Sequence, residues 1–265
     1  MSVALWIVAT PIGTLDDCSP RARRVLAEAA VIAAEDTRTT RKLLGALDLP
    51  APPLVALHAH NEAQRAEALA ARALQEEVAL VTDAGTPGIS DPGRELVRAC
   101  LEAGVRVLSV PGPSALAAAL AASGMPVAPS TFLGFPPRKG RDGWADEVLR
   151  RPETLVCFEA PSRLPDLVAR LAARSPAREA VLCRELSKRH EEVLRAPLEA
   201  LAGLLADRSL KGECVLVVGP GEALEAASGP EVGEGASLKD VAAVLATRWG
   251  ISRREAYQRL LALET

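Results

Sequence analysis

Three loops rich in glycine and proline could hold a small ligand, because each follows a short apolar run that is typical of a β-strand. They cover residues 9–13, 82–93 and 110–115. Glycine lets a backbone approach a ligand closely and proline fixes a turn, so such loops suit a ligand held by main-chain groups. None has the spacing of a Walker A loop or a dinucleotide-binding motif. Ordinary turns use the same residues, but three such loops at strand ends indicate a ligand site in an α/β fold.

The elements that must position these loops form a parallel α/β pattern over residues 1–112, where short apolar runs alternate with helical patterns. Ser19 followed by Pro20 predicts the start of a helix, and Asp91 and Pro92 are expected to start another that Gly104 ends. The predicted strands cover residues 5–9, 31–34, 54–57, 78–82 and 106–110.

A second α/β domain is predicted over residues 113–220, after the Pro-Gly-Pro-Ser run at 111–114. An alanine-rich helix over 115–122 precedes five expected strands. Several of these strands follow one another without room for a long helix, so their sheet should be mixed or partly antiparallel. The strands are predicted at residues 131–135, 154–158, 179–186, 191–195 and 213–218.

The remaining residues read as a linker, 221–236, and a helix-turn-helix-like tail, 237–265. Two capping boxes, Ser237 with Asp240 and Ser252 with Glu255, frame helices over 238–249 and 253–263. Such a pair could dock on the body of the protein, on a partner subunit or on nucleic acid.

Composition limits the class of protein. The 265 residues are 49% hydrophobic and 25% charged, which is typical of a folded globular protein and not of a disordered or fibrous one. The first residues read as a strand without a signal peptide, so we expect a cytoplasmic protein. The five cysteines lack C-x-x-C spacing and there are only three histidines, so we expect buried thiols and no metal site. The formal net charge of −3 excludes a uniformly basic nucleic-acid binder.

Seven segments follow one another in an order typical of a known family, and they are residues 9–13, 33–38, 60–62, 83–93, 111–115, 159–163 and 184–188. Through these segments the chain resembles the tetrapyrrole-methylase superfamily and, within it, the branch that methylates small-subunit ribosomal RNA. The resemblance implies two α/β domains with S-adenosylmethionine (SAM) between them, and a homodimer. It also implies methyl transfer to the ribose 2′-hydroxyl of a cytidine in the decoding region of 16S rRNA, with no metal.

Carried over residue by residue, the resemblance implies a set of SAM-binding positions in both domains. Ser187 stands where the family usually has threonine, which keeps a hydroxyl group. The implied SAM-binding residues are Pro11, Asp83, Ala84, Gly85, Thr86, Ile89, Ser114, Ala115, Glu159, Ala160 and Leu186.

A ribose hydroxyl is a poor nucleophile at neutral pH, so a base should help to remove its proton. The candidates are Glu35, Asp36, Glu62 and Lys188, the last only if its amine is neutral. Surface ion pairs with nearby arginines would equally explain Glu35 and Asp36, and Glu62 could simply open the following helix.

Scattered basic residues would have to hold the RNA, because the chain as a whole is acidic. The densest positive stretch surrounds Arg138, Lys139 and Arg141 in a glycine-containing loop, as phosphate contacts often do. Arg38 and Arg41 could continue this track. Arg253 and Arg254 could add a contact from the tail. With 3% aromatic residues, base stacking is not expected to dominate RNA binding.

Two other functions fit the sequence. One is a small-molecule methyltransferase of the same superfamily, which would act on a free tetrapyrrole-type acid. The other is a non-catalytic RNA-binding factor for ribosome assembly, in which the cleft would have lost its function. Calorimetric titration with SAM separates the second from an enzyme.

Overall fold

The computed structural model describes residues 3–221, 237–249 and 252–261. Both α/β domains belong to one compact unit, and the C-terminal helices belong to a second. Almost all of the predicted linker, residues 222–236, lies outside the described residues.

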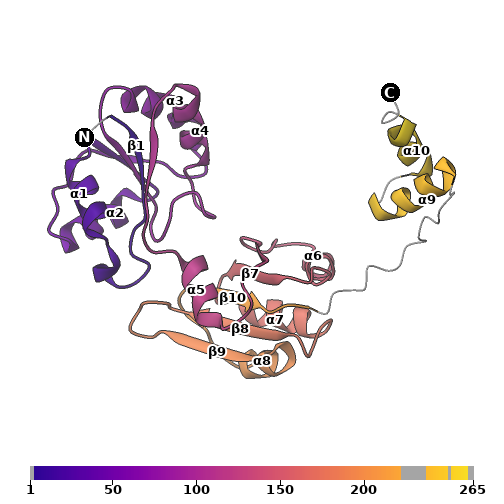
Figure 1. Ribbon diagram of the computed structural model, residues 1–265. Coiled ribbons are helices and arrows are strands. Elements are labelled where there is room, and N and C mark those ends of the chain that lie inside the picture. The colour runs from indigo at the N-terminus through magenta and orange to yellow at the C-terminus, as the bar shows by residue number, and fades with distance from the viewer. Residues whose placement is uncertain (1–2, 222–236, 250–251, 262–265) are drawn as a thin grey trace. The chain divides into compact units, whose positions relative to one another are not determined.

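The first domain is built on a parallel sheet of five strands (Figure 1). The strand order is β3-β2-β4-β1-β5, so β1 lies between β4 and β5. This arrangement confirms the predicted parallel sheet. The strands are β1 (Leu5–Val8), β2 (Val31–Ala34), β3 (Leu54–Ala56), β4 (Val78–Val81) and β5 (Val107–Val110).

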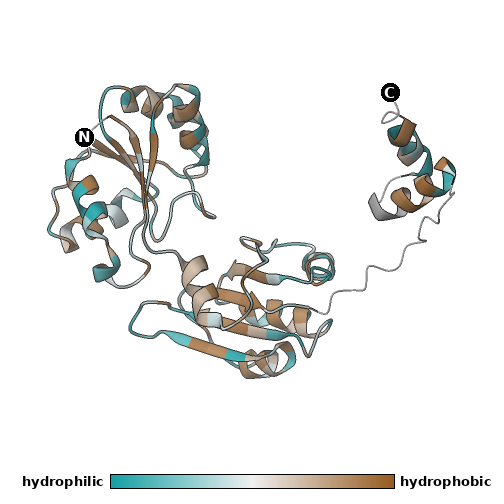
Figure 2. Cartoon of the chain, in the orientation of Figure 1, coloured by the Kyte–Doolittle hydropathy of each residue, from teal (hydrophilic) through white to brown (hydrophobic). Residues whose placement is uncertain are grey.

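Helices cover both faces of this sheet, which explains why its strands are apolar at successive positions. On one face, α1 (Pro20–Glu28) and α2 (Thr37–Ala46) pack on Trp6 and Ile32. On the other, α3 (Glu62–Ala73) and α4 (Arg94–Glu102) pack on Leu5 and Leu80. Figure 2 shows the resulting apolar strands between helices with polar outer surfaces.

The helix starts follow the expected chemistry at α1 but not at α4. The Ser19 hydroxyl accepts a hydrogen bond from the Ala22 N–H at 3.1 Å, and Pro20 is the first helical residue. The prediction that Asp91 and Pro92 start the next helix is wrong, since α4 begins at Arg94 after Gly93. Gly93 has a φ of +134°, so the chain turns there before the helix starts.

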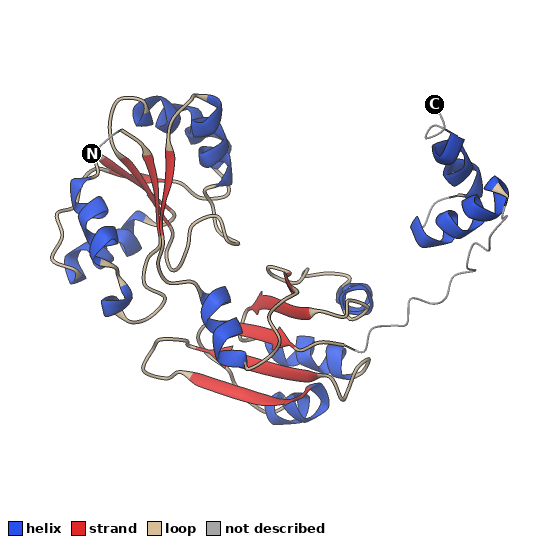
Figure 3. Cartoon of the chain, in the orientation of Figure 1, coloured by secondary structure: helices blue, strands red, loops and turns tan. Residues whose placement is uncertain are grey.

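The second domain contains a mixed sheet in the order β6-β7-β10-β8-β9 (Figure 3). Strands β6 and β7 are parallel and the other neighbours are antiparallel, as predicted for a mixed sheet. The strands are β6 (Ser130–Phe132), β7 (Thr154–Glu159), β8 (Glu179–Arg184), β9 (Glu192–Pro197) and β10 (Cys214–Val218).

One helix covers the first face of this sheet and three cover the second. Helix α5 (Ala115–Ser123) packs through Ala119 on Val156 and Val217. The opposite face carries Leu182 and Leu216, which pack with α6 (Arg141–Val148), α7 (Leu164–Ala172) and α8 (Leu198–Leu205). The five cysteines are free and buried, as expected.

The C-terminal unit is a helical pair of α9 (Leu238–Trp249) and α10 (Arg253–Leu261). The predicted capping box at Ser237 forms, because the Ser237 N–H donates to the Asp240 carboxylate at 3.0 Å and the Asp240 N–H donates to the Ser237 hydroxyl at 3.4 Å. At the second predicted box, the Glu255 N–H donates to the Ser252 hydroxyl at 3.2 Å, and the Glu255 carboxylate pairs with Arg259. Ala246 and Ala256 are buried between the helices. Among the helices that the structure describes, none is long and apolar enough to cross a membrane.

Candidate active site

The three glycine and proline loops lie side by side because they follow β4, β1 and β5, which are neighbours in the sheet. Thr10 and Gly85 exchange two backbone hydrogen bonds, at 2.9 and 3.0 Å. The Thr86 hydroxyl donates to the Pro113 carbonyl at 3.1 Å, which ties the second loop to the third. Gly85 has a φ of +84°, a conformation that favours glycine. The loops therefore form one continuous edge, as the sequence predicts.

A cavity of about 250 Å³ lies against this edge, and both α/β domains line it. Its walls are mainly apolar, and Asp91, Glu159 and Glu213 are the acidic residues among those that line it. The first domain contributes Ile12, Ala84, Gly85, Thr86, Ile89 and Asp91, and the second contributes Ser114, Ala115, Phe135, Phe158, Glu159, Ala160, Pro161 and residues 212–215.

Most of the residues predicted to bind SAM line this cavity, but three do not. Pro11 adjoins the lining residue Ile12. The Asp83 carboxylate accepts a hydrogen bond from the Asp36 N–H at 3.2 Å, outside the lining. Leu186 packs on the apolar core of the second sheet.

The sequence interpretation missed Asp91, the two phenylalanines and the segment 212–215. Asp91 had an ordinary explanation as a helix start. The other missed residues are far in sequence from the glycine loops, and only the fold brings them to the cavity. The glycine at position 212, directly before a predicted strand, was the one local signal.

A loop of the second domain, residues 185–191, holds the two domains together at the cavity. Thr14 donates its backbone N–H to the Ser187 hydroxyl at 3.1 Å and its own hydroxyl to the Ser187 carbonyl at 2.6 Å. The Ser187 hydroxyl in turn donates to the Asp17 carboxylate at 2.6 Å. A Cβ atom at Gly13 would lie 2.6 Å from the Lys188 side chain, so glycine permits this approach.

The same loop supports the cavity segment 212–215 through Glu185. The Glu185 carboxylate accepts hydrogen bonds from the Glu213 N–H at 2.9 Å and from Lys188 Nζ at 2.8 Å. Gly212 has a φ of +87°, and a Cβ there would lie 2.3 Å from the same carboxylate. The close packing of Glu185 against Gly212 thus fixes one wall of the cavity.

Two of the four predicted proton acceptors, Asp36 and Lys188, form ion pairs with neighbouring side chains. The Asp36 carboxylate accepts from the Arg38 N–H at 2.8 Å and pairs with the Arg38 guanidinium, which holds its pKa well below the ordinary value. Burial alone would lower the pKa of Lys188, but hydrogen bonds to Glu185 and Glu213 raise it. Asp36 is therefore a weak base, and Lys188 stays protonated at neutral pH and has no lone pair to accept a proton.

Glu62 is buried and acts as a cap for a neighbouring helix. Its carboxylate accepts hydrogen bonds from the N–H groups of Gly93, Glu95 and Leu96, at 2.9, 2.6 and 3.4 Å. These donors are at the N-terminus of α4, which has no side-chain cap of its own. Glu62 does not line the cavity.

Replacing Glu62 by alanine is expected to lower the free energy of unfolding by about 2 kcal/mol, because three N–H groups at the start of α4, two of them buried, lose their acceptor. The methyl-transfer rate of the remaining folded protein should stay close to that of the wild type. Urea denaturation measures the first effect and a saturated rate the second. Glu67→Ala, on the exposed side of the same helix, is the control, with an expected change below about 0.5 kcal/mol. A lost rate with unchanged stability would instead indicate a catalytic Glu62.

Glu35 and Asp91 are the carboxyl groups near the cavity that could accept a proton. Burial raises the pKa of Glu35, the hydrogen bond from the Asp83 N–H partly offsets this rise, and the negative charges of Asp83 and Asp36 add to it. Glu35 does not line the cavity. Burial also raises the pKa of Asp91, to about 7, with repulsion from Glu35, Asp83 and Glu213 adding to the effect and the Thr82 hydroxyl partly offsetting it. Asp91 combines a pKa near neutrality with a position in the cavity wall.

The predicted RNA-binding residues fall into exposed and buried groups. Arg38, Arg41, Arg138 and Lys139 are exposed in the first unit, and Arg253 and Arg254 are exposed on α10 of the second. Arg141 differs, because its side chain is only 10% exposed. It pairs with Glu159, whose side chain is 0% exposed, so Arg141 is not available to a phosphate.

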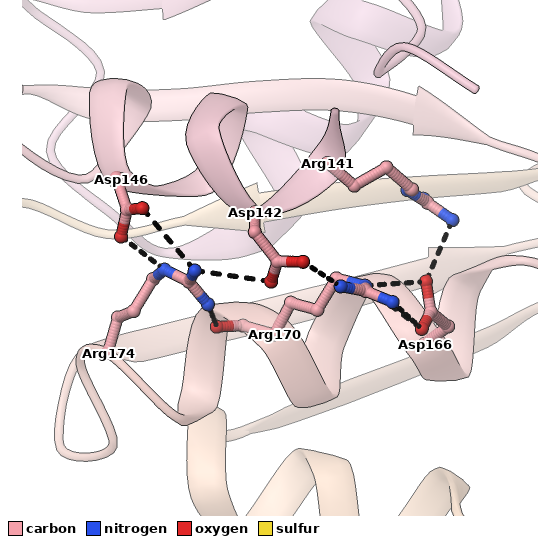
Figure 4. Close-up of polar contacts among 6 residues, drawn as sticks. All are labelled: Arg141, Asp142, Asp146, Asp166, Arg170 and Arg174. Carbon is pink, nitrogen blue, oxygen red and sulfur yellow. Dashed lines mark hydrogen bonds and ion pairs between the residues drawn. The ribbon is translucent and has the colours of Figure 1, made fainter. Parts of the chain in front are cut away.

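Arg141 begins a ladder of ion pairs between α6 and α7 (Figure 4). Glu159 also accepts from Arg163 at 2.6 Å and from the Ala160 N–H at 2.7 Å, which shapes the turn after β7. The ladder therefore connects the outer helices to a residue of the cavity wall. From Arg141 it continues outward through Asp166, Arg170, Asp142, Arg174 and Asp146.

Comparison with known proteins agrees with this arrangement. Residues 4–202 match the family described as Tetrapyrrole (Corrin/Porphyrin) Methylases. The chain belongs to the tetrapyrrole methylase family. The ribosomal RNA small subunit methyltransferase I of Pseudomonas aeruginosa is 42% identical in an alignment of 275 positions that covers 97% of this chain and 96% of the relative. The enzyme of the same name from Xylella fastidiosa is 48% identical over 220 residues, 81% of this chain and 80% of the relative.

Solved structures of tetrapyrrole methylases share the fold. Uroporphyrin-III-C-methyltransferase from Thermus thermophilus has a TM-score of 0.58 and 25% identity, over 82% of this chain and 94% of that one. Another structure of that enzyme contains S-adenosyl homocysteine, with a TM-score of 0.56 and 23% identity over 82% and 97% of the two chains. The present chain is a SAM-dependent methyltransferase.

The residues that line the cavity fit the chemical groups of SAM. Main-chain groups of Ala84, Gly85 and Thr86 are positioned to hold polar parts of the molecule, and the apolar walls suit its adenine. The Asp91 carboxylate in the cavity wall favours a sulfonium cation. Ser114 and Ala115 lie at the start of α5, where backbone N–H groups lack intrahelical partners.

Proposed function

We propose that this protein transfers the methyl group of SAM to the ribose 2′-hydroxyl of a cytidine in the decoding region of 16S rRNA. The observation that carries the proposal is the match to a ribosomal RNA small subunit methyltransferase I along nearly the whole chain, tail included. Exposed arginines and lysines suit an anionic substrate, and the phosphates of RNA are the anions that this match implies. Arg138 and Lys139, which follow the lining residue Phe135 within four positions, favour a phosphate-bearing substrate.

SAM supplies an electrophilic methyl group when it is bound. The chain must then place the hydroxyl oxygen in line with the bond that breaks, since alignment provides much of the acceleration in a displacement at carbon. The new bond joins the ribose oxygen to the methyl carbon, and the sulfur keeps the electron pair of the bond that breaks. The hydroxyl proton goes to the Asp91 carboxylate, which lines the cavity and has a pKa of about 7.

The test uses the purified full-length protein, SAM and 30S subunits from a strain in which its gene is deleted. Mass spectrometry of the rRNA nucleosides should show one new ribose-methylated cytidine in the decoding region. Free tetrapyrrole acids and naked 16S rRNA are assayed in parallel. Methylation of a tetrapyrrole but of neither RNA would contradict the proposal, and so would SAM binding without transfer to any of these substrates.

The proposed substrate also places the protein in the cytoplasm, where ribosomal subunits are assembled. A homodimer stays a prediction from the family resemblance. Sedimentation of the purified protein measures it directly.

A further inference from the structure

The three phenylalanines of the chain form one cluster, and two of them line the cavity. The Phe132 and Phe158 rings meet edge to face with centroids 4.9 Å apart, and Phe135 meets Phe158 in the same way at 5.7 Å. Phe158 and Phe135 both line the cavity. The cavity wall therefore contains two rings of one aromatic cluster.

Phe135 is the unusual member of this group, because 54% of its surface is exposed. No other aromatic residue appears among the exposed large apolar side chains of the described residues. Phe158 supports one edge of the ring, so Phe135 has a supported position beside the cavity and a surface open to solvent. Exposed apolar surface at a binding site is a common mark of a ligand contact.

The backbone around Phe135 is held on both sides. Pro136 is buried directly after it. Gly134 before it has a φ of +64°, and a Cβ there would lie 3.4 Å from the Ser90 hydroxyl of the first domain. Ser90 immediately precedes Asp91, so the ring is fixed close in the structure to the segment that carries the proposed proton acceptor.

The exposed ring is followed by exposed basic residues. Arg138 and Lys139 are three and four positions beyond Phe135, a spacing that suits one nucleotide whose base meets the ring while adjacent phosphates meet the charges. A nucleotide whose ribose reaches into a cavity must leave its stacked neighbours, and its base then needs a new surface to stack on.

We infer that Phe135 is the stacking platform for a nucleobase turned out of the RNA, and that it positions the nucleotide whose ribose is methylated. The inference rests on the proposed function and adds the residue that receives the base. The low aromatic content predicts that base stacking does not dominate RNA binding. A single ring beside the cavity is nevertheless enough to stack one base.

The test compares Phe135→Ala, Phe135→Leu and Phe135→Trp in the full-length protein. With 30S subunits as the substrate, we expect Ala and Leu to raise KM for the subunits about tenfold or more, and Trp to stay within about threefold of the wild type. Leucine is apolar but has no ring, so the contrast between Leu and Trp isolates stacking from hydrophobic contact. Leu101→Ala removes another exposed apolar side chain, on α4, and serves as the control.

Calorimetry with SAM distinguishes this role from a contact with the methyl donor. The dissociation constant for SAM should be the same in the wild type and in the three Phe135 variants. A KM that is equal in Phe135→Ala and the wild type would overturn the inference, as would an Ala effect confined to SAM affinity or a Leu variant that behaves like Trp. If the wild-type protein itself transfers no methyl group to the subunits, the proposed function fails and the inference fails with it.

Discussion

Replacing Asp91 by asparagine is expected to lower the rate of methyl transfer at saturating SAM and RNA by about 10²-fold to 10⁴-fold, the usual contribution of a positioned general base. An amide has nearly the size of the carboxyl group but accepts no proton at neutral pH. The dissociation constant for SAM should change far less than the rate. Single-turnover kinetics with 30S subunits measures the rate, and calorimetry measures the affinity.

The pH dependence gives a second readout. The pKa of Asp91 is raised to about 7, so the carboxyl group is protonated and inactive as a base below that pH. The wild-type rate should rise as the pH increases through 7 and level off near 8. Any residual rate of Asp91→Asn should lack this rise. The neighbouring carboxyl groups that shift the Asp91 pKa are Glu35, Asp83 and Glu213, so Glu35→Gln should move the rise to lower pH without removing it.

Stability should change in the opposite direction to activity. A carboxyl group whose pKa is raised on folding binds a proton more tightly in the folded than in the unfolded state. The folded state therefore loses stability as the pH rises from the ordinary value of 3.8 towards 7. Asparagine has no charge to bury, so Asp91→Asn should unfold at a higher urea concentration than the wild type at pH 8.

Glu102→Gln is the matched control for Asp91, since it makes the same chemical change at an exposed position on α4. It should alter neither rate nor pH profile. An Asp91→Asn protein with the full wild-type rate would contradict the assignment. An equal loss of rate and of SAM affinity would instead make Asp91 a ligand for the donor.

Replacing Glu159 by alanine is expected to lower the free energy of unfolding by about 3–5 kcal/mol, because it removes one partner of a buried ion pair. The Arg141 side chain, 10% exposed, would keep Asp166 as a partner but lose its fully buried one. The Ala160 N–H would lose its acceptor at the cavity wall. Urea denaturation measures the stability, and SAM affinity should fall in the fraction that stays folded.

The outer end of the same ladder supplies the control. Asp142 pairs with Arg170 and Arg174, but its side chain is 62% exposed. Exposed ion pairs contribute little, so Asp142→Ala should cost no more than about 1 kcal/mol. Equal losses for Asp142→Ala and Glu159→Ala would show that burial does not set the strength of this ladder.

The sequence was sufficient to predict the part of the site that comes from one sheet edge. Apolar runs followed by glycine and proline located the three loops, and the parallel order of the strands then placed them together. The same reasoning could not find Phe135 or Glu213, because their contribution depends on how the second sheet meets the first. The sequence around these two residues contains no pattern that predicts a contact between the two sheets.

Charged residues were the hardest to interpret from the sequence, because their role depends on burial. Arg141 and Arg138 look equivalent in a basic loop, yet Arg141 is an internal ion-pair partner and Arg138 is exposed. Glu62 and Asp91 both looked like groups at the start of a helix. In the fold, Glu62 caps a helix other than its own and Asp91 lines the cavity.

The hydrogen bonds between Thr14 and Ser187 join residues that are 173 positions apart. During synthesis, the first domain can complete its sheet once β5 has emerged, but it then has only one wall of the cavity. The opposite wall needs residues 212–215, which are made about one hundred residues later. A nascent chain therefore has its glycine loops long before it can hold the methyl donor, and the enzyme becomes competent only when translation of its second domain is nearly finished.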